Sequence, residues 1–307
     1  MRDRSLDTPF VMSLLMAVGT GLAVLLTVLP APSEESRVGA DVAERVGEEL
    51  ESRRFGTGAE GIRGRWDVFA ASAHAVPVVI SKEGSGSGVV VNMDPATSTG
   101  LIITNHHVIA PPFRDKEGRE FVMLVFYEPQ LAREPFDNVR VADCLKSPSG
   151  SSWCEMFRRV VRLGLVVRSD PDRDLGVVVV GDLPTGVRPI PFANLDQVRP
   201  GDEVMVIGHP LNLVWSLTSG IVSAVRSEFR ITQSSRGITV VQTQTPIHPG
   251  NSGGPLLTAE GQLVGVMFSS HLLPTMQGTR DNPRVPAAGL NFAVAVTEVR
   301  DLIATLR

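Results

Sequence analysis

Short apolar runs separated by turn residues follow one another from about Trp66 towards the end of the chain. The runs are rich in Val, Ile and Leu and are bounded by Gly, Pro and Asn: PVVIS, SGVVVN, GLIITN, EFVMLVFY, VVRLGLVV, LGVVVV, EVMVIG, LTSGIVSAV, ITVVQT, LVGVMF and FAVAV. This pattern is typical of β-strands. No helical segment alternates with the runs, which argues against a parallel α/β sheet. We therefore predict an all-β fold of the sandwich or barrel kind.

A proline-rich stretch at residues 184–201 divides this β region into two halves. We predict the first half at about 66–183 and the second at about 184–296, inside one domain that spans 66–307. Residues 297–306 carry their apolar positions on one helical side, which predicts a terminal helix: Val299, Leu302, Ile303 and Leu306.

The N-terminal part has a different composition. After a tail of residues 1–9, residues 10–29 contain no charged side chain, and as a helix they would span about 30 Å, the thickness of a bilayer core. A cleaved signal peptide is the alternative, but the exit Leu29-Pro30-Ala31-Pro32 fits a small-x-small cleavage site poorly. We expect an uncleaved transmembrane signal anchor, followed at 30–65 by a linker and a short helix.

Charge and cysteine content restrict the partners and the compartment. The chain carries 29 Lys and Arg against 33 Asp and Glu, a net charge of −4, so we expect no nucleic-acid partner. Cys144 and Cys154, the two cysteines, suit a disulfide in an oxidising compartment; two unrelated buried thiols are the alternative. A zinc site is disfavoured because no histidine lies between them. We therefore expect the domain on the extracytoplasmic (periplasmic) side of a membrane.

The segment with the clearest chemical signature is GNSGGPL, residues 250–256. A serine framed by glycines is sterically open, and such a loop can aim successive backbone N–H groups at one point, as a tetrahedral oxyanion requires. An ordinary glycine-rich turn is the alternative. A serine nucleophile also needs a base that a third group orients.

Candidates for that base and that third group stand at strand boundaries. His106 and His107 follow an apolar strand in the sequence TNHHV, and Asp174 directly precedes the strand LGVVVV. The chain order is therefore His, Asp, Ser. The three motifs together predict a serine hydrolase more strongly than any one of them does.

These motifs resemble the catalytic signatures of trypsin-like serine proteases, specifically those of the HtrA/Deg branch. SGSGV, GHP, TSGIVS and NFAV match the same family in order, and the resemblance runs from about residue 66 to 306. It implies a trypsin-like double six-stranded antiparallel β-barrel with a C-terminal helix, polypeptide substrates, no cofactor and a homotrimer. Most HtrA relatives carry a PDZ domain; the sequence stops at Arg307, directly after the predicted helix, and we expect none.

The resemblance also assigns roles to residues. His107, rather than His106, occupies the histidine position and would be the general base, and Asp174 would orient it. Ser252 would be the nucleophile. The N–H groups of Gly250 and Ser252 would line the oxyanion hole, with Asn251 between them. No residue set is assigned to a metal.

The segment before the serine departs from the family pattern. The family usually has T-D-A-A-I-N-P-G, whereas residues 243–250 read TQTPIHPG. Ile247 matches the apolar residue of the loop that shapes the primary specificity pocket, so we predict a substrate-binding role and a pocket for small or medium aliphatic side chains. His248 is interpreted as a local hydrogen-bonding residue. The long segment that carries the cysteine pair is predicted to form an inserted surface loop.

These observations predict a membrane-anchored serine endopeptidase that acts on envelope or misfolded proteins through an acyl-enzyme intermediate. The alternative is a catalytically silent or latent relative that binds polypeptides without cutting them. A metal-dependent hydrolase built on His106 and His107 is disfavoured because the chain lacks an H-E-x-x-H arrangement.

Overall fold

The computed structural model describes residues 64–134, 136, 138–146, 151–232, 235–268 and 290–306. The predicted anchor at 10–29 and almost all of the predicted linker at 30–65 lie outside these residues. Among the helices of the described part, none combines the length and the apolar character that crossing a membrane demands.

The first half of the protein is an antiparallel β-sheet. Its strands are β1 (Val78–Ile80), β2 (Ser85–Ser87), β3 (Val89–Asp94), β4 (Thr99–Thr104), β5 (Phe113–Arg114), β6 (Glu120–Val125), β7 (Val161–Asp170) and β8 (Leu175–Val180). Hydrogen-bonded neighbours follow the order β2-β1-β6-β7-β8-β4-β3, with β5 beside β6. The prediction of a closed six-stranded barrel is therefore wrong for this half. Two short strands, β2 and β5, raise the number to eight, and the path of pairings stays open between β2 and β3.

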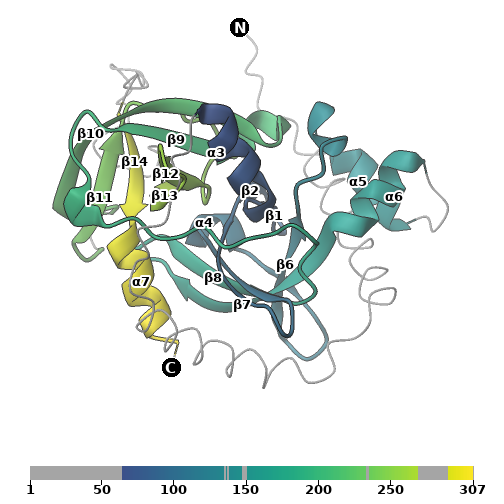
Figure 1. Cartoon of the computed structure of the whole chain (residues 1–307). Helices are drawn as coiled ribbons and strands as arrows, with labels where there is room; N and C mark the ends of the chain where they lie inside the picture. The colour runs from purple at the N-terminus through teal and green to yellow at the C-terminus, as the bar shows by residue number, and fades with distance from the viewer. Residues whose placement is uncertain are drawn as a thin grey trace, which may run out of the picture.

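The second half is a closed six-stranded antiparallel barrel, as predicted. Its strands are β9 (Glu203–Gly208), β10 (Ser216–Phe229), β11 (Ile238–Thr243), β12 (Pro255–Thr258), β13 (Leu263–Phe268) and β14 (Asn291–Ala295), paired in the circular order β10-β11-β14-β13-β12-β9. Closure leaves no free strand edge. In a barrel of this size, the inward-facing side chains of the strands fill the interior. Figure 1 shows this barrel beside the first sheet, with the long strand β10 along its outer side.

Helices lie at the two ends of the fold. The C-terminal helix α7 (Val296–Ala304) buries Val299, Leu302 and Ile303, which confirms the predicted terminal helix with a start one residue earlier. Helix α3 (Arg65–Ser72) and the 3-10 turn η1 (Ala73–Ala75) occupy a segment expected to be the start of the β region. That expectation is wrong because α3 buries Val68 and Ser72, four residues apart on one helical face.

The segment between β6 and β7 is a pair of packed helices rather than the expected surface loop. The pair comprises α5 (Asn138–Lys146) and α6 (Ser152–Val160), which follow the 3-10 turn η2 (Leu131–Arg133). Trp153, Phe157 and Val160 are buried along one face of α6, at the spacing of an amphipathic helix. Cys144 and Cys154 form a disulfide between the two helices. In Figure 1 the pair projects from the side of the first sheet that is remote from the second barrel.

Candidate active site

His107 and Asp174 are brought together by the pairing of β4 with β8. Thr104, at the end of β4, lies opposite Gly176 of β8, so the residues just beyond β4 and just before β8 are neighbours. The short helix α4 (His106–Ile109) begins there. The backbone N–H of His107 donates to Asp174 Oδ1 (3.0 Å), and His107 Nδ1 lies 2.7 Å from Asp174 Oδ2. Both carboxylate oxygens therefore bind the same histidine.

The contacts around His107 and Asp174 determine which ring nitrogen of the histidine has no partner. Asp174 is buried, and its backbone carbonyl accepts a hydrogen bond from Asn105 Nδ2 (2.8 Å). The His107 side chain is one-third exposed. With Nδ1 held by the carboxylate, Nε2 is left for a reacting group, which is the arrangement of a general base. His106 has another partner, because its Nδ1 lies 2.6 Å from Ser169 Oγ.

Ser252 reaches the same region from the second barrel, on the segment between β11 and β12. Its carbonyl accepts a hydrogen bond from the N–H of Ser87 (2.8 Å). Gly86 is in contact with both sides of the site: a Cβ atom there would lie 2.7 Å from Val108 and 2.9 Å from the Ser252 carbonyl. The loop that carries Ser252 and helix α4 therefore pack on the same strand, β2.

The hydroxyl of Ser252 is not engaged. Ser252 is buried, and within the described ranges its Oγ makes no hydrogen bond, so the contact to His107 is open in this structure. Catalytic hydrogen bonds are often long without substrate and tighten when substrate binds. The loop of Ser252 and the helix of His107 therefore lie against the same strand, β2, and no hydrogen bond joins the Ser252 hydroxyl to His107 in the described structure.

The residues before the nucleophile form a type II turn, His248–Asn251, which we call the oxyanion turn. The N–H of Asn251 donates to the carbonyl of His248 (3.0 Å), and Gly250 has φ +103°. A type II turn requires positive φ at its third residue and favours proline at its second, where Pro249 stands. A Cβ atom on Gly250 would lie 2.2 Å from the carbonyl oxygen of His209, so only glycine fits this position.

Neighbouring segments hold the carbonyl groups of this turn. The N–H of Leu211 donates to the Pro249 carbonyl (3.0 Å), and Ser87 Oγ donates to the Gly250 carbonyl (2.7 Å). Fixing the Pro249 carbonyl turns the N–H of Gly250, on the same peptide plane, to the opposite side. In the part of the chain that the structure describes, neither Gly250 N–H nor Ser252 N–H donates to a protein acceptor. Both amides are thus available to an oxyanion.

Comparisons with known proteins identify the family of this chain. The family model of the trypsin-like peptidase domain matches residues 86–266, which include His107, Asp174 and Ser252. The chain belongs to the trypsin-like peptidase family. Protease Do-like 5 from the chloroplast of Arabidopsis thaliana is 29% identical over 71% of this chain and 55% of its own length. Serine protease PepD of Mycobacterium tuberculosis is 34% identical over 44% of this chain and 29% of its own length. The chain thus spans about half or less of the length of these two relatives, a Do-like protease and a serine protease.

Solved structures share the fold of this trypsin-like peptidase. An HtrA-type protease, AlgW, with a bound tripeptide has a TM-score of 0.51 and 22% identity, covering 78% of this chain and 62% of that one. An inactive Ser-to-Ala form of Rv3671c from M. tuberculosis has a TM-score of 0.52 and 20% identity, covering 78% of this chain and 89% of that one. At these identities the likeness concerns the fold alone.

One buried histidine of this trypsin-like peptidase was not singled out as a site residue. His209 precedes the 3-10 turn η4 (Pro210–Asn212), and its Nδ1 accepts a hydrogen bond from the N–H of Trp215 (3.0 Å). Burial lowers the pKa of His209 to about 3, although the carbonyls of Pro77 and Val76 oppose that effect. In the described structure its Nε2 is buried and has no hydrogen-bond partner. The neutral ring therefore supports the loop that carries the Leu211 N–H.

The predicted specificity residue lies beside the oxyanion turn. Ile247 is partly buried and packs against the apolar core of the second barrel, and the preceding Pro246 is exposed and accepts a hydrogen bond from Thr218 Oγ1 (3.3 Å). His248 is exposed and contributes its carbonyl to the turn. No acidic residue occupies residues 243–250, so a basic substrate side chain has no carboxylate partner in this segment.

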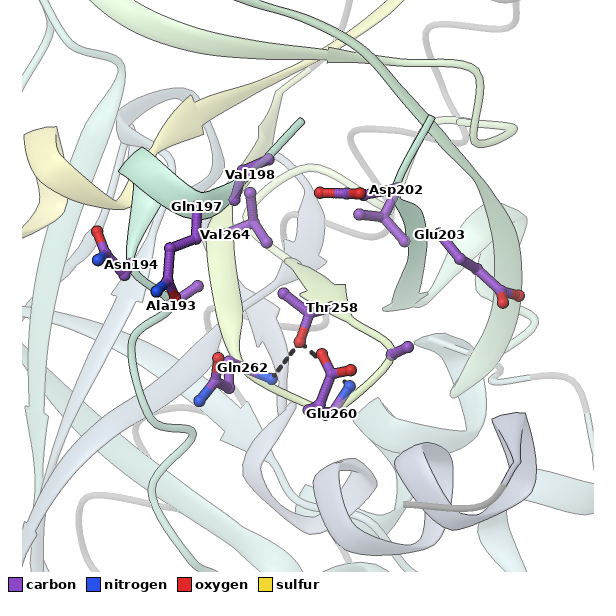
Figure 2. A pocket seen from close by; sticks show the side chains of 12 residues that line it. Ala193, Asn194, Gln197, Val198, Asp202, Glu203, Thr258, Glu260, Gln262 and Val264 are labelled. Atoms are coloured by element: carbon purple, nitrogen blue, oxygen red, sulfur yellow. Dashed lines mark hydrogen bonds between the residues drawn. The ribbon is translucent and has the colours of Figure 1, made fainter. Parts of the chain in front are cut away.

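A separate pocket of about 280 Å³ lies on the second barrel (Figure 2). Its lining comes from residues on either side of η3 (Leu195–Gln197), from the start of β9 and from the β12–β13 hairpin. In the hairpin, Thr258 Oγ1 accepts hydrogen bonds from the backbone N–H groups of Glu260 (3.2 Å) and Gln262 (3.3 Å). None of His107, Asp174 and Ser252 lines the pocket. Within the described residues, no group of three or more His, Cys, Asp and Glu side chains is placed to hold a metal ion.

Proposed function

We propose that the protein is a serine endopeptidase that hydrolyses peptide bonds of exposed or misfolded polypeptides with His107, Asp174 and Ser252. The observation that carries the proposal is the pair of hydrogen bonds from His107 to Asp174, at 3.0 and 2.7 Å, together with the free amides of Gly250, in the type II turn, and of Ser252, which follows it. A base oriented by a buried carboxylate, a serine and oxyanion donors are the parts that acyl transfer needs.

The proposed reaction has two steps. Ser252 Oγ attacks the carbonyl carbon of the scissile bond while His107 Nε2 takes the hydroxyl proton; the C–N bond then breaks, and His107 gives that proton to the leaving amine. Water next attacks the ester carbonyl, passing one proton to His107, which returns it to Ser252 Oγ as the ester bond breaks. Asp174 remains ionised and stabilises the imidazolium in each step.

The oxyanion turn supports both tetrahedral intermediates. The N–H groups of Gly250 and Ser252 are the proposed donors, with Asn251 between them. Each such donor is worth about 100- to 1,000-fold in rate. The two anchored carbonyls, those of Pro249 and Gly250, keep the turn in place before substrate arrives.

Ile247 is the proposed determinant of the primary specificity pocket, which we propose takes small or medium aliphatic side chains. Its position beside the oxyanion turn and the lack of an acid in residues 243–250 support this proposal. A peptide library with each residue type before the scissile bond is the measurement. Acceptance of basic residues alone would contradict the proposal.

We also propose the cellular setting. Residues 10–29 would anchor the protein in a membrane, with the protease domain on the extracytoplasmic (periplasmic) side, where a disulfide such as Cys144–Cys154 persists. The resemblance to HtrA-type proteases favours a homotrimer. Membrane fractionation and analytical ultracentrifugation of the detergent-extracted full chain test these two points.

Labelling with a fluorophosphonate tests the catalytic proposal, because this probe reacts with activated serines. We expect labelling of the full chain and none of Ser252→Ala or His107→Ala. His106→Ala is the matched control, since His106 binds Ser169 instead of Asp174, and it should label like the natural protein. A folded natural protein that does not label would contradict the proposal and favour a silent relative that binds polypeptides.

A further inference from the structure

The acid of the proposed triad stands in a strained turn. The hairpin turn between β7 and β8 runs from Asp170 to Asp174, and Asp174 has φ +52°. The left-handed region costs most non-glycine residues about 1–2 kcal/mol, and aspartate enters it more readily than most when its side chain is hydrogen-bonded. The backbone bond that closes the turn, from the N–H of Asp174 to the carbonyl of Pro171, is long at 3.4 Å. Side-chain contacts must therefore contribute to holding this conformation.

Arg173, directly before the acid, supplies those contacts. Its backbone N–H donates to Asp170 Oδ1 (3.0 Å), and its Nη1 lies 2.6 Å from Asp170 Oδ2. Burial pushes the pKa of Asp170 upward, but these hydrogen bonds and the charge of Arg173 outweigh burial and hold that pKa below its usual value. The two ends of the turn are thus joined by a charge-assisted pair.

The same guanidinium reaches across to the second half of the protein. Arg173 Nε lies 3.1 Å from Glu298 Oε2, and both side chains are nearly buried. Glu298 stands in the first turn of α7, where a carboxylate is favoured by the helix dipole. Its other contacts are with the Thr239 N–H at the start of β11 (2.9 Å) and with Arg236 Nη2 (2.6 Å). Figure 1 shows α7 below the second barrel, next to the sheet that contains β7 and β8.

We infer that Arg173 and Glu298 are positioning residues for the Asp174 carboxylate, an inference that rests on the proposed function. Arg173 closes the turn onto Asp170, and Glu298 ties that turn to the second half, which also carries Ser252. Both oxygens of Asp174 hold His107, so a small displacement of the turn breaks two hydrogen bonds at once. A misplacement of about 1 Å costs on the order of 100-fold in rate.

Arg236→Gln provides a matched control. Arg236 contacts the same Glu298 oxygen but has no hydrogen bond to the turn that carries Asp174, and its side chain is 44% exposed. Arg173→Gln and Glu298→Gln remove the contact under test. Arg173→Lys keeps the charge but loses the forked geometry of the guanidinium, so it serves as the conservative variant.

The first readout is the rate of fluorophosphonate labelling per folded molecule of the full chain. We expect Arg173→Gln to label about 10- to 100-fold more slowly, Glu298→Gln to be slowed in the same direction, and Arg173→Lys to be intermediate. Arg236→Gln should stay close to the natural protein. Equal labelling rates in Arg173→Gln and Arg236→Gln, even with lower melting temperatures, would overturn the inference, because the contact would then only stabilise the fold.

The second readout does not need catalysis. In the Ser252→Ala background, the low-field proton resonance of His107 Nδ1–H reports its hydrogen bond to Asp174. We expect this resonance to be lost or broadened by Arg173→Gln and kept by Arg236→Gln. An unchanged resonance in Arg173→Gln would overturn the inference, whereas failure of the natural protein to label would contradict only the proposed function.

Discussion

The N–H of Leu211 donates a hydrogen bond to the carbonyl of Pro249, at 3.0 Å. This contact joins the loop after β9 to the oxyanion turn, and it sets the direction of the Gly250 N–H. Leu211 itself has φ +50°, a backbone conformation that is strained for a leucine. On the other side, the N–H of Phe136 donates to the Asn212 carbonyl (2.8 Å), which connects the segment leading to the helical pair with this same loop.

Gly250→Ala should abolish labelling by fluorophosphonate while the protein stays folded. A methyl group at Gly250 would collide with the His209 carbonyl at 2.2 Å, so the turn must leave its type II conformation. We expect a loss of at least about 100-fold, the worth of one oxyanion donor. Gly201→Ala is the control: Gly201 has φ +98°, close to that of Gly250, but open space around its Cβ position. It should cost about 1–2 kcal/mol of stability and leave labelling unchanged; equal effects of the two variants would contradict the account.

Ser87→Ala should slow catalysis, because Ser87 Oγ holds the Gly250 carbonyl at 2.7 Å. Losing a neutral hydrogen bond costs about 1 kcal/mol. If this free energy destabilises only the conformation of the oxyanion turn that supports catalysis, the rate falls roughly fivefold. Steady-state cleavage of a fluorogenic peptide measures the effect, expected in kcat. Ser81→Ala, which removes a similar bond to the Gly84 carbonyl away from the site, should leave kcat unaltered.

Acid should destabilise the protein through His209. Its pKa is about 3 in the folded state, against an ordinary value of 6.5, so the unfolded state binds the proton more readily. The free energy of unfolding is therefore complete above about pH 6.5 and falls towards pH 3, by up to about 1.4 kcal/mol per pH unit. Denaturant titrations at several pH values should show a shallower dependence for His209→Asn. The exposed His248, changed to Asn, should keep the natural dependence, and a slope unaffected by His209→Asn would count against this assignment.

Reduction of the Cys144–Cys154 disulfide should loosen the helical pair first. The disulfide joins α5 directly to α6 and links residues 10 positions apart. A disulfide that closes a loop of this length contributes about 3 kcal/mol to the free energy of unfolding. Hydrogen exchange followed by mass spectrometry should show faster exchange in residues 151–160 after reduction or in the double Cys→Ser variant. Strands of the second barrel should exchange as before. Unchanged exchange in 151–160 would show that the packing of Trp153 and Phe157 holds the helices without the bond.

The sequence was most informative where one chemical feature decides the structure. Apolar runs bounded by turn residues predicted every strand that is longer than the four-residue β12, because a buried strand needs such a run; β12 itself was not among the predicted runs. GNSGGPL indicated the turn, since the positive φ of Gly250 and Gly253 and close contacts to both residues admit no side chain. The motif TNHHV directly follows an apolar run, so the sequence alone placed a histidine just beyond the end of a strand.

Other features could not be predicted because they depend on distant contacts. β2 and β5 are short strands without an apolar run, so only their pairing with β1 and β6 makes them strands. The contact between Arg173 and Glu298 joins residues 125 positions apart, and no local pattern marks it. The bond from Leu211 to Pro249 uses backbone atoms alone. The spacing of Trp153, Phe157 and Val160, in contrast, is that of a helix, and the prediction of a surface loop overlooked it.

Cleavage of an unfolded polypeptide is the decisive test of the proposed triad. The full chain would be incubated with a reduced, carboxymethylated protein, and the fragments would be identified by mass spectrometry, beside Ser252→Ala, His107→Ala and His106→Ala. The account predicts internal cuts by the natural protein and by His106→Ala, and a loss of about 10⁴-fold or more in the other two variants. Cuts that persist in Ser252→Ala, or a natural protein that binds the polypeptide without cutting it, would contradict the proposed triad.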